Sequence, residues 1–186
     1  MPDEHSPDSM TPTLVATLRD GDASSAELLD LLYGRKLVRF ALGYLGNATE
    51  AEDAVQDVFY LVLRNDSIPD NFRAWIYRIC RNRCLDVLRA RGRRRDDQTL
   101  LTDAPYRADL TGQLTHLVRQ ERHEKLRRLL DELPPAQHEV LRLRYSEGLS
   151  RAEIADVLDI PESVVKSRLY EGLEKLRRHD SLADRG

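Results

Sequence analysis

Apolar residues recur at intervals of three and four along most of the chain from Leu28 onward, and the alternation of apolar and polar residues that marks β-strands is almost absent. This spacing places apolar side chains along one face of a helix, where they can be buried together. Glycine and proline, which interrupt helices, are sparse. The pattern therefore predicts an all-α protein.

Two helices are expected before residue 65. The first runs from about Ser24 to Leu45 and ends at the Gly46-Asn47 pair, and the second begins at a capping box formed by Thr49 and Glu52. The expected buried positions of the first helix are Leu28, Leu31, Leu32, Leu37, Val38, Ala41, Leu42 and Leu45. Those of the second are Ala51, Ala54, Val55, Val58, Leu61 and Val62.

A third helix follows a loop of turn-forming residues and carries a dense block of positive charge. Asp70 can cap this helix, which is expected to reach about Arg91. The segment from Asn71 to Arg95 holds nine arginines and one acid, a net charge of +8 in a chain whose formal net charge is -3. A solvated face would mix acids among the bases, so the block indicates phosphate binding. Phe72, Trp75 and Ile79, at helical spacing, are assigned mainly to packing.

The sequence predicts two small helical domains joined by a flexible linker. Periodicity lapses between Gly92 and Thr115, in a mildly acidic stretch, and returns in helices expected over about Leu117 to Leu133 and Gln137 to Glu147. The expected limits are a disordered tail over residues 1–22, a helical domain over 23–95, a linker over 96–116 and a second helical domain over 117–180.

The second domain is expected to contain a helix-turn-helix. Ser150 and Glu153 form a capping box before a short helix, and Pro161 suits the first position of a longer one. The N-terminal half of the longer helix then exposes polar side chains that can reach base edges and phosphates in a major groove. They are Lys166, Ser167, Arg168 and Tyr170. An ordinary helical hairpin with a solvated charged face is the alternative.

An acidic cluster on the second expected helix admits three interpretations. Glu50, Glu52, Asp53 and Asp57 could form a solvated face, a docking surface for a partner, or part of a divalent metal site in an all-α hydrolase. Metal catalysis needs carboxylates that converge from more than one helix, and the other acids of this half lie on loops or tails. We therefore expect no catalytic residues, no metal and no cofactor.

The number of cysteines and the composition of the N-terminus indicate the cellular compartment in which the protein is expected. Cys80 and Cys84 are too few for a disulfide scaffold, suit a reducing cytoplasm and are expected to be buried core thiols. The acidic N-terminus lacks the apolar core of a signal peptide, and no apolar run approaches the ~20 residues that a membrane span needs. A cytoplasmic protein without a membrane span is expected.

Three stretches in this order resemble the extracytoplasmic-function (ECF) sigma factors, small members of the sigma-70 family of RNA polymerase factors. AEDAVQDVFYLVLR (Ala51 to Arg64) resembles the family's polymerase-binding stretch. FRAWIYRICRNRCLDVLRARGRR (Phe72 to Arg94) resembles its promoter-melting helix, which recognises the −10 element. The segment from Leu130 to Arg178 resembles its −35 recognition domain.

The resemblance implies a sigma factor without enzymatic activity that binds core RNA polymerase and promoter DNA. Such a factor recognises the −10 and −35 elements and assists promoter melting. An anti-sigma factor is implied as a further partner. The resemblance also implies polymerase contacts by Asp53, Gln56, Asp57 and Phe59. The −10 DNA contacts it implies, including a loop that holds a flipped base, are Asn65, Asp66, Ser67, Asn71, Arg73, Trp75, Arg78, Arg81, Asn82 and Arg89. For the −35 DNA they are Ser150, Ser163, Lys166, Ser167, Arg168, Tyr170 and Glu171.

The sequence departs from the family pattern within the helix-turn-helix. Asp159 stands in the turn where the family often has glycine, the Glu162-Ser163 pair replaces the usual Gly-Thr, and Glu171 falls where a base is frequent. These departures bear on which −35 sequence is recognised. The rival functions are a DNA-binding regulator that acts without polymerase and an all-α metal-dependent nucleotide hydrolase. The regulator would need a ligand pocket or a phosphoacceptor site in the first domain.

Overall fold

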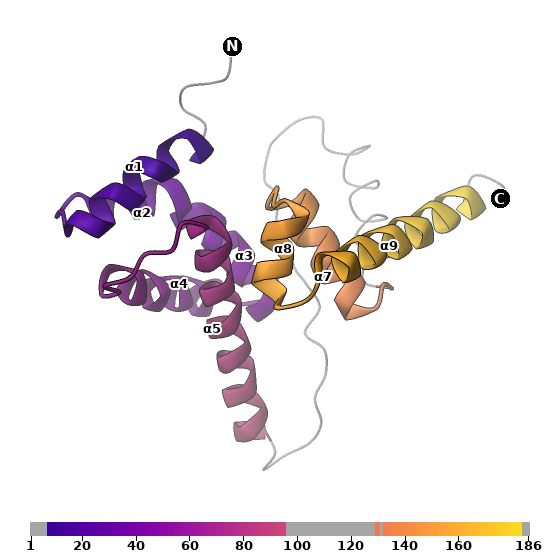
Figure 1. The fold of residues 1–186 in the computed structure, drawn as a ribbon. Helices are drawn as coiled ribbons and strands as arrows, with labels where there is room; N and C mark the ends of the chain where they lie inside the picture. Colours follow the sequence, from indigo (N-terminus) through magenta and orange to yellow (C-terminus); the bar gives the residue numbers. More distant parts are fainter. Residues whose placement is uncertain (1–6, 96–128, 131, 184–186) are drawn as a thin grey trace, which may run out of the picture. The chain divides into compact units, whose positions relative to one another are not determined.

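The structure is a computed structural model that describes residues 7–95, 129–130 and 132–183. Contacts between Cα atoms divide the chain into two compact units, residues 1–108 and 109–186, and each unit is described by itself. Every regular element in the described residues is helical, which confirms the expected all-α class (Figure 1). None of these helices is both long and apolar enough to cross a bilayer. The expected linker over residues 96–116 lies outside the described residues.

Unit 1 is a chain of helices with short connections. They are α1 (Pro7–Asp20), α2 (Ser25–Leu29), the π-helix η1 (Asp30–Gly34), α3 (Arg35–Leu45), α4 (Ala48–Leu63) and α5 (Phe72–Arg95). α3, α4 and α5 pack against one another, and α1 packs against α2, η1 and α5. The core of the unit therefore lies among α3, α4 and α5.

Aromatic rings connect the helices of this core. Phe40 of α3 meets Tyr77 of α5 edge-on, with ring centroids 5.1 Å apart, and Tyr33 of η1 meets Phe72 in the same way at 5.6 Å. Edge-to-face pairs of this kind are favoured by the ring quadrupoles. Cys80 and Cys84 are fully buried on α5, as expected of core thiols.

The turn between α3 and α4 is fixed by two adjacent residues. Gly46 adopts a left-handed conformation, with φ of 64°, and ends α3 as the sequence predicts. Asn47 caps α4, because its side chain accepts a hydrogen bond from the Glu50 backbone N–H at 3.1 Å. The capping box expected at Thr49 and Glu52 is wrong, since the helix begins before those residues.

The helix expected over Ser24–Leu45 is interrupted by the π-helix. One set of its buried residues recurs every four positions, at Ser25, Leu29, Tyr33, Leu37, Ala41 and Leu45, and Leu32, Gly34 and Phe40 are buried next to that set. Steps of four exceed the α-helical turn of about 3.6 residues, so such a stripe drifts around a straight α-helix, and a wider π turn offsets the drift. Leu31, expected to be buried, is instead 73% exposed. Leu61 of α4 was also expected to face inward and is 51% exposed.

A helix occupies most of the region expected to be a disordered tail. Leu14 of α1 is fully buried, and the Thr11 hydroxyl lies 3.1 Å from the Tyr33 hydroxyl of η1. The expectation failed because it rested on the acids and prolines of residues 1–22, whereas Leu14 is buried against a core that residues distant in sequence form.

Unit 2 consists, in the described residues, of α7 (Pro135–Tyr145), α8 (Arg151–Leu158) and α9 (Glu162–Ala183). Most of the helix expected over Leu117–Leu133 lies outside the described residues. Of the residues in that range that the structure describes, 129 and 130 are helical. α7 and α8 both pack against α9. Their core contains Val140, Leu143, Leu149, Ile154, Val157 and Val165.

The helix-turn-helix is built as the sequence predicts. The capping box is confirmed, because Ser150 Oγ accepts from the Glu153 N–H at 3.1 Å and Glu153 Oε2 accepts from the Ser150 N–H at 2.7 Å. Asp159 ends α8 with φ of 54° and ψ of 50°, in the left-handed region that glycine adopts most readily. On α9, a Cβ at Gly172 would lie 2.9 Å from Leu141 Cδ1, so the missing side chain permits the close approach of α7 and α9.

We predict that Leu14→Ala lowers the free energy of unfolding of unit 1 by about 2–5 kcal/mol, because it removes a buried side chain and leaves a cavity. Trp75 is the single tryptophan of the chain and lies on α5, so its fluorescence during urea unfolding reports on unit 1. Leu31→Ala is the matched control and should change the stability by no more than about 0.5 kcal/mol. Equal effects of the two substitutions would mean that α1 does not stabilise the unit.

We also predict that Asp159→Gly stabilises the helix-turn-helix by up to about 1 kcal/mol, because glycine relieves the left-handed strain of an L-residue. Asp159→Val should destabilise it, since a β-branched side chain tolerates this conformation least. Amide hydrogen exchange of α8 in the intact chain measures both effects. Slower exchange in the Val variant than in the Gly variant would contradict the strain argument.

Candidate nucleic-acid interface

The outward face of α4 combines exposed polar and aromatic side chains. Asp53 and Gln56 are exposed, and Asp57 and Phe59 are half-buried. Tyr60, 58% exposed, follows Gln56 at the four-residue spacing that places both side chains on one face. Tyr60 was not among the expected contacts, although an exposed tyrosine on a polar helix face is typical of a protein interface.

Two acids of the expected cluster turn toward α5 and pair with its arginines. Asp57 Oδ2 accepts from Arg83 Nε at 2.8 Å and lies 2.5 Å from Arg83 Nη2. Glu50 forms an ion pair with Arg91, which also donates from Nη1 to the Leu45 carbonyl oxygen at 3.0 Å. Two carboxylates of the cluster are therefore part of the α4–α5 contact, and Glu52 and Asp53 are left as exposed acids.

These contacts also bear on the metal-site interpretation of the cluster. The α5 residues that meet Glu50 and Asp57 are cations, whereas a divalent metal needs several oxygen, nitrogen or sulfur ligands that converge. Residues 7–95 and 132–183 contain no group of three or more His, Cys, Asp or Glu side chains arranged to hold a metal ion.

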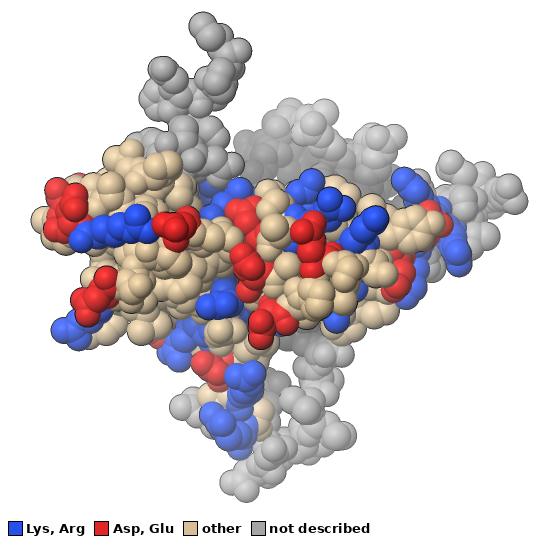
Figure 2. Space-filling model, in the orientation of Figure 1, with Lys and Arg blue, Asp and Glu red and all other residues tan. Residues whose placement is uncertain are grey.

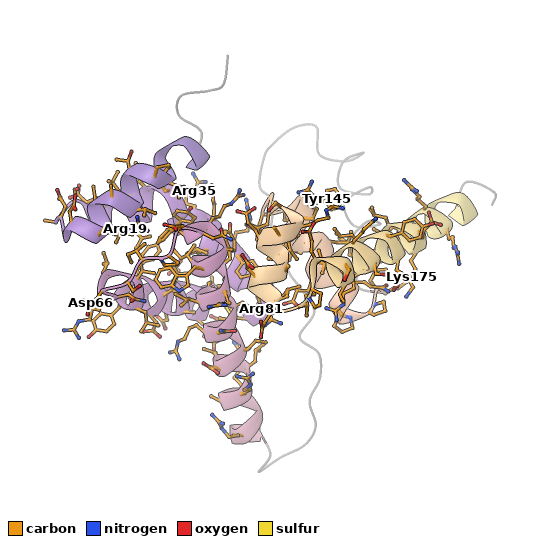
Figure 3. The ribbon with its side chains drawn as sticks, viewed as in Figure 1. Arg19, Arg35, Asp66, Arg81, Tyr145 and Lys175 are labelled. Atoms are coloured by element: carbon orange, nitrogen blue, oxygen red, sulfur yellow. The ribbon has the colours of Figure 1, made fainter. Side chains whose placement is uncertain are left out.

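The loop between α4 and α5 is held at both ends and in the middle. Asn65 Oδ1 accepts from the Ser67 N–H at 3.0 Å, and Asn71 Oδ1 accepts from the Ala74 N–H at 3.4 Å. Asn71 therefore takes the cap position that was expected for Asp70. Ile68 is 6% exposed and inserts into the core. Asp66 lies on the outside of unit 1 (Figure 3).

Arg19 of α1 holds the middle of this loop. Its Nη2 donates to the Ile68 carbonyl oxygen at 2.9 Å and to Asp70 Oδ1 at 2.8 Å. The sequence carried one signal for this residue, because Arg19 is the single base in the acidic segment from Met1 to Leu32. Nothing in the sequence indicated its partner, because Ile68 lies 49 residues further along the chain.

The arginines of α5 divide into structural and outward-facing groups. Arg83 and Arg91 pair with acids of α4, and Arg89 pairs with Asp86 one helical turn before it, at 2.7 Å. Arg78, Asn82 and Arg93 are exposed, while Arg73 and Arg81 are half-buried. Figure 2 shows basic side chains along the end of α5 that projects from unit 1. The side chains of Arg94 and Arg95 lie outside the described residues.

Trp75 and Phe72 confirm the assignment of the α5 aromatics mainly to packing. Phe72 is 1% exposed, and Trp75 lies half-buried against it, with ring centroids 5.7 Å apart. Trp75 keeps part of its ring at the surface, next to the loop.

The exposed face of α9 carries four of the expected −35 contacts. Ser163, Lys166, Ser167 and Tyr170 are all exposed, and intervals of three and four residues place them on one side of the helix. Tyr170 is 67% exposed, whereas Arg168 is half-buried. The opposite side of α9 is buried at Val165 and Gly172.

Two other expected −35 contacts are occupied within unit 2. Glu171 Oε2 accepts from Gln137 Nε2 of α7 at 2.8 Å, and Gln137 is 7% exposed. The Ser150 hydroxyl accepts the capping hydrogen bond of α8. At the start of α9, Glu162 pairs with Arg151 of α8 at 3.3 Å, so a base offsets the charge of this acid. Sequence reasoning missed both Gln137 and Arg151.

Comparison with known proteins gives matches in both units. The family model described as Sigma-70 region 2 matches residues 29–94, and the one described as Sigma-70 region 4 matches residues 123–176. The RNA polymerase sigma-H factor of Pseudomonas aeruginosa is 31% identical over 173 residues, which cover 88% of this chain and 90% of that protein. The ECF sigma factor SigW of Bacillus subtilis is 29% identical over 178 residues, covering 88% and 93%.

Solved structures show a similar fold. The sigma factor RpoE of Bartonella quintana, in complex with the anti-sigma factor NepR, gives a TM-score of 0.66 at 24% identity, covering 84% of this chain and 96% of that one. CnrH in complex with the cytosolic domain of CnrY gives a TM-score of 0.63 at 23% identity, covering 92% and 96%.

Proposed function

The chain belongs to the sigma-70 family, among its ECF members, and we propose that it binds core RNA polymerase through unit 1 and directs it to promoters by contacts from both units. The observation that carries this proposal is that regions 2 and 4 match in order, one in each helical unit. Proteins of this family act in transcription initiation as regulators, and we propose no chemical reaction for this chain.

The polymerase contact is proposed for the outward face of α4. Asp53 and Gln56 offer exposed polar groups, and Phe59 lies half-buried beside them. Asp57 would contribute mainly through the fold, since Arg83 already binds its carboxylate. The electrostatic part of docking is therefore assigned to Asp53, with Tyr60 adding aromatic contact area.

The −10 contact is proposed for the loop after α4 and for the outward arginines of α5. Asn65, Asp66 and Ser67 are exposed and would surround an unpaired base. Extruding a base costs a few kcal/mol, which pocket and phosphate contacts have to offset. Arg78 is exposed and is placed to bind the strand backbone, while Asn82 is one helical turn further on. The proposed surface is completed by Asn71, Arg73, Trp75, Arg81 and Arg89. Of these, Asn71 also caps α5 and Arg89 also pairs with Asp86.

The −35 contact is proposed for the exposed face of α9. Ser163, Lys166, Ser167 and Tyr170 would enter the major groove, and Arg168 would reach a flanking phosphate. Glu171 and Ser150 are proposed to act on DNA indirectly, by holding α9 on α7 and capping α8.

The proposal extends to the organisation and partners of the chain. The domain limits 23–95 and 117–180, with a linker over 96–116, are proposed from the sequence pattern. An anti-sigma partner is proposed because two structures of similar fold were solved as complexes, one of them with a named anti-sigma factor. The site of action is proposed to be the cytoplasm, where a bacterial cell keeps its polymerase and DNA.

Reconstitution with core RNA polymerase tests the proposal. The purified protein should co-elute with core enzyme and support run-off transcription from a subset of a promoter library. Tight, specific binding to duplex DNA without polymerase, together with no co-elution, would instead favour a DNA-binding regulator. Magnesium-dependent hydrolysis of a nucleoside triphosphate by the purified protein would favour the hydrolase.

We predict that Asp53→Arg combined with Gln56→Ala abolishes co-elution with core polymerase, because a reversed charge at a docking face opposes the potential of the partner. Both side chains are exposed, so circular dichroism should show unchanged helical content. Glu27→Arg, at an exposed acid of α2, is the matched charge-reversal control and should co-elute normally. Normal yield of the double variant would assign the α4 face another role.

We further predict that Lys166→Ala costs about 1–3 kcal/mol of discrimination at one or two −35 positions, because a direct base contact carries that much. The measurement is holoenzyme transcription from a randomised −35 library with the −10 element fixed. Lys175→Ala removes an equally exposed lysine later in α9 and should leave the sequence preference unchanged (Figure 3). If Lys166→Ala alters only total output, this side chain contacts phosphate and not a base.

A further inference from the structure

Arg19 joins the N-terminal helix to the loop that separates α4 from α5. One guanidinium nitrogen, Nη2, donates to the Ile68 carbonyl oxygen at 2.9 Å and to Asp70 Oδ1 at 2.8 Å. The backbone contact matters most, because it fixes the path of the main chain and not merely a side chain. Asp66 and Ser67 lie exposed just before this point.

Two further hydrogen bonds of the loop are local and lie near its ends. Asn65 bonds to the backbone of Ser67, and Asn71 caps α5 through Ala74. Between these ends, the side chain of Ile68 is buried, which holds the loop to the core from inside. Arg19 holds the same residue from outside, so the two contacts together define where the exposed residues stand.

α1 is itself fixed to the core, and this makes Arg19 a firm attachment. Leu14 is fully buried, and Thr11 lies within hydrogen-bonding distance of Tyr33, 3.1 Å between hydroxyl oxygens. Tyr33 in turn packs edge-on against Phe72, the first residue of α5. α1 is therefore linked to the start of α5 through Tyr33 of η1, and to the loop before α5 through Arg19.

The Arg19–Asp70 pair adds little to the stability of the fold. The side chain of Arg19 is 48% exposed and that of Asp70 fully exposed, and exposed ion pairs are weak because water screens them. A contact of this kind can still act on binding, since a loop that is ordered beforehand does not have to lose conformational freedom when its ligand arrives.

We propose that Arg19 is a positioning residue for promoter opening: it holds the loop over Asn65–Asn71 in the conformation that receives an unpaired base. This inference rests on the proposed function of the loop. Arg19 itself touches no DNA in this scheme. Its removal should lower the rate at which holoenzyme opens duplex promoters and leave polymerase binding intact.

The test compares holoenzymes carrying wild-type protein, Arg19→Ala, Arg19→Lys and the control Arg35→Ala. Each is assayed on a duplex promoter and on the same promoter with a mismatched, already open −10 region. Arg19→Ala should lose about tenfold in open-complex formation on the duplex, equivalent to ~1.4 kcal/mol, and should recover on the open template. Arg19→Lys keeps a charged donor and should restore part of the loss. Arg35 is an exposed arginine at the start of α3, and its removal should have little effect on either template (Figure 3).

Two further readouts separate positioning from a general loss of structure. Amide hydrogen exchange over residues 65–71 of the free protein should be faster in Arg19→Ala, whereas co-elution with core polymerase should be unchanged. Equal losses on both templates, reduced co-elution, or wild-type rates on the duplex would each overturn the inference. If wild-type protein neither binds polymerase nor transcribes from either template, the proposed function itself fails, and this inference fails with it.

Discussion

The packing of α5 against α3 and α4 is the interaction on which the rest of unit 1 depends. α5 supplies buried aromatic side chains, such as Tyr77, and also most of the positive charge of the unit. A helix with so many arginines can pack closely only if acids meet those on its inner edges, and Asp57 and Glu50 of α4 do so. Part of the acidic surface of α4 is thus a consequence of the basic surface of α5. Exposed charged side chains outside these pairs, among them Asp53 on α4 and Arg78 on α5, are available to partners.

Sequence reasoning succeeded at several local signals, although the caps expected at Thr49 and Asp70 lie one or two residues from the observed caps Asn47 and Asn71. Gly46 and the Ser150–Glu153 box act on backbone groups within four residues of themselves, so their effect can be derived without knowledge of the fold. It failed at α1, because the burial of Leu14 depends on a surface made by residues distant in sequence. It failed at Leu31 for a related reason: a buried stripe with a period of four does not reveal by itself where the helix will widen.

In the candidate site, too, the sequence predicted local features and missed contacts between helices. Exposed residues at helical spacing, such as Ser163 and Lys166, follow from the amphipathic pattern of α9. Bonds between elements do not, and two expected contacts proved to be engaged with a neighbouring helix: Asp57 with Arg83 and Glu171 with Gln137. A polar residue on a helix surface becomes a candidate for recognition only when no neighbouring helix offers it a partner. That condition requires the tertiary structure.

The π-helix has a consequence for how this part of the chain tolerates changes in length. An exposed leucine lies inside it, between the buried Leu29 and Tyr33. Deletion of Leu31 would leave those two residues three positions apart, a spacing that a continuous α-helix also brings to one face. The segment can therefore lose Leu31 without losing a core side chain. Alignments of related chains should accept a single-residue gap within residues 30–34, and an alignment that forbids it would misplace every buried position toward the N-terminus by one.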